Sequence, residues 1–303
     1  MANSLYIRQN DPNILKCLVA QRELYARAKL WAYVPMTSAI VLSVFTLCRE
    51  SLRGISDWTS ASVFGATILV WILMLAGEFC VSQLRKRAAR LQQFIDREIF
   101  QDAFTSDQLS RWRDVPLKGE IAKEISIGAC ERATDIQRVQ NWYSDYSALS
   151  SQEAVLRCQK ENIRWDFKLR VIMAITIGLG LITFFILVVV GVWDEKVSKA
   201  IAILSAGAGV CSYLFRLLVR ICNDLFNLSK LNIIEGSIEE ALENDVMIGA
   251  QLLEAQDLIY ESRSNCVLVP EWLYRMSLNS RQNTENAVAR AHESFIGRGV
   301  TDA

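Results

Sequence analysis

Residues 138–166 contain the side chains best suited to bind a ligand. Basic and aromatic residues are interleaved there with amides and carboxylates. Aromatic faces can stack on nucleotide bases, and guanidinium groups can bind phosphate oxygens. The mixture therefore favours a small anionic nucleotide as the ligand. The candidate contacts are Arg138, Trp142, Tyr143, Arg157, Lys160, Arg164 and Trp165.

A purely structural interpretation of the same stretch stays open. Trp142 and Trp165 would then fill the core of a helical bundle. Arg157 and Arg164 would pair with nearby glutamates on a solvated helix face, as charges three or four residues apart do. Residue types alone do not separate a binding site from such a core.

Motifs of known enzyme classes are absent from the sequence. It contains no GxSxG, GxxxxGK[ST], HExxH or dinucleotide-binding pattern. The cysteines form no CxxC pair and His292 is the single histidine, so metal ligands are scarce. We therefore predict a protein that is not an enzyme and needs no metal or cofactor. A net charge of zero gives no general attraction to DNA or RNA.

Four apolar stretches must position these residues. They cover residues 30–47, 58–81, 171–193 and 197–218, and none has a charged residue at its centre. Each is close to the roughly 20 helical residues that cross a hydrocarbon core. The connections within each pair are short, so the stretches predict four transmembrane helices in two hairpins.

The polar remainder of the chain reads as helical, which makes the predicted fold all-α. Apolar residues continue at helical spacing beyond the second and fourth stretches, so these helices should extend into a cytoplasmic bundle. Asp11 before Pro12, and Ser150 three residues before Glu153, predict helix starts. The predicted regions are an N-terminal helix (1–29), hairpin 1 (30–81), a central region (82–170), hairpin 2 (171–218) and a C-terminal region (219–303).

Lysine and arginine clusters predict the orientation in the membrane. They lie before the first stretch, at residues 85–90, at 168–170 and at 216–220. Such clusters near the ends of spans stay on the cytoplasmic side. Both termini and the central region should therefore be cytoplasmic, and only two short loops should lie outside.

Small residues in the fourth stretch predict close helix packing. Ser205, Gly207 and Gly209 would let neighbouring membrane helices approach, either within one chain or between copies.

Short motifs occur in a fixed order around the two apolar pairs. They are RQN at 8–10, AQR at 20–22, NWYSD at 141–145, CQKEN at 158–162 and VPEWLY at 269–274. With these motifs the chain resembles, over nearly its whole length, the SMODS-associating four-transmembrane effector family of bacterial CBASS anti-phage systems.

The resemblance implies a function that the residues alone do not show. A cyclic-nucleotide synthase would respond to infection, and its cyclic di- or trinucleotide product would bind the cytoplasmic part. The membrane part would then form a homo-oligomer or rearrange in the lipid bilayer of the inner membrane. Loss of membrane integrity would cause abortive infection.

Two other functions remain open from the residues. The first is an ordinary ion channel or transporter, although no charged residue lies at mid-span. The second is a membrane-anchored module whose cytoplasmic helices recruit a protein partner.

Overall fold

The computed structural model describes residues 4–52, 60–128, 136–193, 197–243, 248–274 and 276. Within these residues the secondary structure is helical, with no strand, which confirms the predicted all-α class. The elements are α1 (Leu5–Arg8), α2 (Pro12–Leu52), α3 (Ser60–Phe100), η1 (Gln101–Ala103), α4 (Ser106–Ser110), α5 (Lys118–Gly128), α7 (Ser151–Val192), α8 (Val197–Glu243) and α9 (Gly249–Asn265).

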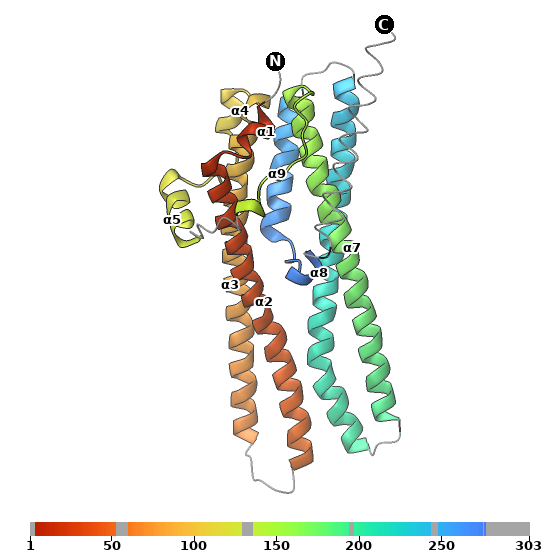
Figure 1. Cartoon of the computed structure of the whole chain (residues 1–303). Coiled ribbons are helices and arrows are strands. Elements are labelled where there is room, and N and C mark those ends of the chain that lie inside the picture. The colour runs from red at the N-terminus through yellow and green to blue at the C-terminus, as the bar shows by residue number, and fades with distance from the viewer. Residues whose placement is uncertain are drawn as a thin grey trace.

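Four long helices dominate the molecule. They have 41, 41, 42 and 47 residues in α2, α3, α7 and α8. At 1.5 Å per residue they are about 60–70 Å long, roughly twice the hydrocarbon thickness of a bilayer. Helix α2 packs on α3, and α7 packs on α8 (Figure 1). The boundaries predicted at residues 81, 170 and 218 therefore fall inside continuous helices.

Local signals fix where two of these helices begin. Asp11 Oδ1 accepts a hydrogen bond from the Asn13 backbone N–H at 2.8 Å, at the start of α2. Ser150 Oγ accepts one from the Glu153 N–H at 3.3 Å, at the start of α7. Both predicted helix starts are confirmed, because a side-chain oxygen there satisfies an N–H that has no partner within the helix.

One half of each long helix is rich in apolar residues, and many of the described side chains there are exposed. We call residues 30–52, 60–81, 171–192 and 197–218 the apolar half, and the described residues 4–29, 82–128, 136–170, 219–243 and 248–274 the polar half. Leu187 and Val190 of α7 are 64% and 68% exposed. Other exposed apolar side chains of this half are Leu69, Ile72, Leu75, Leu179 and Phe185. Contact with hydrocarbon suits such a surface, whereas water does not.

Three of the described helices are long and apolar enough to cross a membrane. They run over Pro12–Phe45, Ile68–Ala103 and Ser151–Val190. The fourth predicted stretch falls on α8, and the side chains of residues 197–209 lie outside the described part of the structure. Ser205, Gly207 and Gly209 are among them, so their predicted packing role stays a prediction.

The polar half has a conventional buried core. Leu91 and Ile99 of α3 pack there with Leu18 of α2, Leu156 of α7 and Leu252 of α9. Helix α9 lies between the two helix pairs, near the end of the molecule that carries α1 and α4 (Figure 1). The predicted extensions of the second and fourth apolar stretches are confirmed, since α3 continues to Phe100 and α8 to Glu243.

Candidate functional site

The seven predicted ligand contacts do not form one pocket. Tyr143 lies in the main core of the polar half, and Trp142 packs half-buried against that core. Trp165 lies in a second apolar cluster near the start of the apolar half. Arg138 is exposed. Arg157, Lys160 and Arg164 are on α7, and charged residues of α8 lie near them.

Tyr143 is held rigidly and is only 1% exposed. Its hydroxyl donates to Asp96 Oδ1 at 3.0 Å and accepts from Asn162 Nδ2 at 2.9 Å. The Gln9 side chain binds both its backbone N–H and its carbonyl, at 2.7 and 3.1 Å. A base could stack on this ring only if the core opened.

A left-handed turn directs Tyr143 inward. Asn141 has φ of 52°, a conformation that asparagine adopts more readily than most residues. Its backbone N–H donates to Asn10 Oδ1 at 3.1 Å, and Asn10 Nδ2 donates to Asn141 Oδ1 at 3.0 Å. The RQN and NWYSD motifs are therefore in contact, although they are far apart in the sequence.

A buried ion pair joins α3 to α9 beneath this turn. Arg263 Nη1 contacts Asp96 Oδ2 at 2.6 Å, and Gln256 Nε2 donates to the same oxygen at 3.0 Å. Burial alone would lower the pKa of Arg263, but the facing Asp96 carboxylate raises it above its ordinary value. Removing Asp96 would leave the Arg263 guanidinium as an uncompensated buried charge.

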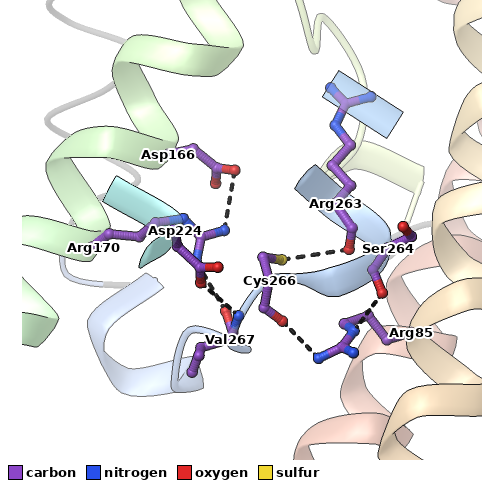
Figure 2. A network of polar contacts seen from close by, with 8 residues as sticks. All are labelled: Arg85, Asp166, Arg170, Asp224, Arg263, Ser264, Cys266 and Val267. Atoms are coloured by element: carbon purple, nitrogen blue, oxygen red, sulfur yellow. Dashed lines mark hydrogen bonds and ion pairs between the residues drawn. The ribbon is translucent and has the colours of Figure 1, made fainter. Parts of the chain in front are cut away.

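A second buried arginine lies where the polar half meets the apolar half. Arg170 of α7 is 1% exposed, and its Nη1 donates to Asp224 Oδ2 of α8 at 2.9 Å and to the Val267 carbonyl at 3.1 Å (Figure 2). Its Nη2 lies 3.3 Å from Asp166 Oδ2. Asp224 also accepts from the Val267 N–H at 2.8 Å. These contacts bring α7, α8 and the segment after α9 together.

The segment 266–274, which we call the junction segment, also binds the other two long helices. Arg85 of α3 donates to the carbonyls of Ser264, just before it, and of Cys266 within it, both at 2.8 Å (Figure 2). Lys29 of α2 contacts Glu271 at 2.9 Å. The VPEWLY motif belongs to this segment and contacts α2 and α7, while Cys266 and Val267 just before it contact α3 and α8.

Trp165 belongs to the same junction. Its ring meets that of Tyr274 edge-on, with centroids 6.2 Å apart, and Leu273 lies in the same buried cluster. Lys29 Nζ lies 5.4 Å from the centroid of the Tyr274 ring. In the described structure Trp165 therefore packs within the junction.

The three cations on α7 form the part of the predicted set that is chemically suited to an anion. Arg157 Nη1 lies 2.7 Å from Glu239 Oε1 of α8, and Lys160 Nζ contacts the other oxygen of that carboxylate. Burial favours the neutral form of Glu239, but the hydrogen bonds from Lys160 and Arg157 lower its pKa below the ordinary value. We call Arg157, Lys160 and Arg164 the basic face of α7.

A small cavity lies between α7, α8 and α9. Its volume is about 10 Å³, and its lining includes Asn162, Ser262 and Arg263. That space holds about one water molecule, whereas small-molecule sites typically occupy roughly 300–1,000 Å³. A nucleotide does not fit this cavity in the described conformation. Among the described residues, no group of three or more His, Cys, Asp or Glu side chains is placed to hold a metal.

Sequence reasoning missed Asp96, Arg263 and the cluster around Arg170. A signal existed for Asp96, because this carboxylate stands beside Ile95 in the apolar stripe of α3. Arg170 directly precedes the third apolar stretch, where its charge predicts only the orientation in the membrane. Its partner Asp224 is 54 residues away in the sequence, and periodicity within one helix does not reveal such a pair.

The fold and these sites define a class: a helical membrane protein whose membrane helices continue into a polar core containing buried ion pairs. The model of the SMODS-associating 4TM effector domain matches residues 3–294, and the chain belongs to that family. It is also similar to a "Probable CBASS effector molecule" of Bacillus cereus (strain VD146), with 22% identity over 279 residues, 88% of this chain and 90% of that protein. No solved structure matches the chain.

Proposed function

We propose that this protein is a CBASS effector that a cyclic oligonucleotide switches on. A cyclic di- or trinucleotide, made by a cyclic-nucleotide synthase after phage infection, binds the polar half. The protein then rearranges or forms a homo-oligomer in the bacterial inner membrane and disrupts it, so the infected cell dies before phage mature. Family membership and the name of the Bacillus cereus relative support this proposal.

The observation that carries the proposal is the continuity of the four long helices. Each runs without a break from the polar half into the apolar half. A displacement at the polar end therefore reaches the membrane without passing through a flexible linker. An anchored module that only recruits a partner has no need of this continuity.

The proposed orientation places both termini and the polar half in the cytoplasm. The arginine and lysine clusters of the sequence support it. One end of the molecule, opposite α1 and α4, holds the C-terminal ends of α2 and α7 (Figure 1). The N-terminal ends of α3 and α8 lie at the same end. Four membrane spans with two short outer loops fit that arrangement.

The proposed ligand contacts centre on the basic face of α7. Arg157 and Arg164 can hold phosphate oxygens in the paired geometry that guanidinium groups favour, and the Lys160 ammonium can add a third positive charge. The half-buried Trp142 and the exposed Arg138 are further candidate contacts. Tyr143 and Trp165 are assigned to packing, since each is buried and has its contacts within the protein.

A ligand can operate this switch only through unequal affinity for two states. Moving a population from 1:99 to 99:1 takes about 5.5 kcal/mol of differential binding. A cyclic oligonucleotide with two or three phosphates can supply this if the active state offers its charges more contacts than the resting state does.

Dye release from proteoliposomes tests the proposal. The purified full chain is reconstituted in vesicles that contain a trapped dye, and a panel of cyclic di- and trinucleotides of adenosine and guanosine is added. We expect release with one of them and none with the corresponding linear mononucleotide. Constant release without any nucleotide would favour an ordinary channel. Tight nucleotide binding without release would contradict the killing step.

A further inference from the structure

The basic face of α7 meets a pair of glutamates on α8. Glu239 contacts both Arg157 and Lys160, and all three side chains are between 17% and 30% exposed. Solvent therefore reaches this cluster from one side. Glu235, one turn earlier on α8, is completely buried. The two glutamates are four residues apart, so they lie on the same side of their helix.

Glu235 is unusual because its buried carboxylate lacks hydrogen-bond donors among the described residues. A buried carboxylate without donors is costly as an anion, and this burial raises the pKa of Glu235 to about 8 despite the nearby Lys160 and Arg164. The ionised groups of the cluster are therefore the three cations, Glu239 and Glu153, whose Oε1 lies 3.8 Å from Arg157 Nη2.

The spacing of the cations makes them one surface. Arg157, Lys160 and Arg164 are three and then four residues apart, which places them along one side of α7. Lys160 and Arg164 both favour ionisation of Glu235, so both lie near it on the α8 side. The cluster is partly desolvated, so an anion that reaches these cations is attracted more strongly than it would be in water.

On the basis of the proposed function, we propose that Arg157 and Lys160, extended by Arg164, form the subsite for a phosphodiester group of the cyclic oligonucleotide. Glu239 occupies this subsite in the resting protein, and the phosphate displaces it. A phosphodiester presents two anionic oxygens on one centre, as a carboxylate does, so it can accept the same two donors.

The displacement has a mechanical consequence. The contacts of Glu239 hold the end of α8 against α7, and α8 is continuous from there into the apolar half. A phosphate that takes the two donors releases this end of α8. The site thereby links ligand occupancy to the relative position of two helices that continue into the membrane.

Calorimetric titration of the full chain in detergent tests the subsite. The probes are inorganic pyrophosphate and the same panel of cyclic di- and trinucleotides. Glu239→Gln removes the competing charge and keeps the size of the side chain, so pyrophosphate should bind about tenfold more tightly, as expected for the loss of one charge-assisted contact. Arg157→Gln and Lys160→Gln should each weaken binding about tenfold or more.

Glu124→Gln is the matched control. Glu124 also forms an ion pair with an arginine, Arg87, at 2.7 Å, but on α5 and α3, away from the subsite. It should leave pyrophosphate affinity unchanged. Thermal unfolding of every variant shows which of them fold, and two separate cation variants keep the test decisive if one of them is unstable.

The outcomes separate the subsite from the function. Equal pyrophosphate affinity in Glu239→Gln and the unaltered protein, or no binding to either, would overturn the subsite. Cyclic-oligonucleotide binding that survives both Arg157→Gln and Lys160→Gln would overturn it too, while leaving the proposed function intact. The expected pyrophosphate pattern without any binding of cyclic oligonucleotides would support the anion subsite and would count against the proposed function.

Discussion

Glu235→Gln should remove a large pH dependence of stability. In the folded protein, burial raises the pKa of Glu235 from 4.5 to about 8. The groups that face it are Lys160 and Arg164 of α7 and Glu239 of its own helix. Because the folded state holds the proton more tightly than the unfolded state, stability is highest below about pH 4.5. It falls as the pH rises and levels off above about pH 8.

The size of the effect follows from the difference in pKa. About 3.5 pKa units, at roughly 1.4 kcal/mol each, correspond to about 5 kcal/mol across the whole window. Within it, the free energy of unfolding should fall by about 1.4 kcal/mol per pH unit relative to Glu235→Gln, which has no proton to lose. Glutamine can be buried without charge, so the variant should be the more stable protein above pH 7.

Denaturant unfolding in detergent, measured between pH 5 and pH 8.5, is the assay. The quantity of interest is the difference between the unaltered protein and Glu235→Gln, since other groups titrate equally in both. Glu254→Gln is the control, because Glu254 is exposed on α9. Parallel pH profiles for the unaltered protein and Glu235→Gln would refute the reasoning and show that Glu235 ionises freely.

Three further predictions concern the ion pairs, the topology and the apolar half. Asp96→Ala should destabilise the fold by about 3–5 kcal/mol in denaturant unfolding, because Arg263 is left buried without its partner; a loss below about 1 kcal/mol would contradict this. A cysteine at Ser51 should react with a periplasmic thiol reagent and one at Ser106 should not; labelling of Ser106 in intact cells would reverse the topology. Gly209→Leu should block dye release while nucleotide affinity falls by only about 1–3 kcal/mol; full release would show that Gly209 is not at the assembly surface.

Periodicity along the chain predicted the long helices well, because the spacing of apolar residues within one segment is enough to indicate a helix. The apolar residues of α3 recur at 91, 95 and 99, and all three are buried. The caps Asp11 and Ser150 also contact backbone N–H groups only two or three residues further along the chain. These features need only the geometry of a single helix, so the sequence contains enough information to place them.

The candidate site was predicted only in part, because it depends on contacts between distant residues. Asp96 and Arg263 are 167 positions apart, and the position of Asp96 in an apolar stripe indicates a buried carboxylate but does not identify its partner. Residue type alone predicted Tyr143 and Arg157 equally as ligand contacts. The turn at Asn141 sends Tyr143 into the core, whereas Arg157 stays at a partly exposed surface.

The junction segment limits how the protein can rearrange. It is tied to α2 through Glu271 and to α3 through Cys266, while Val267 contacts both Arg170 of α7 and Asp224 of α8. Breaking one buried ion pair costs about 3–5 kcal/mol, which is close to the roughly 5.5 kcal/mol that a ligand needs for the whole switch. A transition that opened this junction would leave almost no free energy to shift the population. We therefore expect the junction to stay closed and to act as a pivot, with each long helix moving as a rigid body around it. In that arrangement a small release of α8 at Glu239, on one side of the pivot, is accompanied by movement of the apolar half on the other.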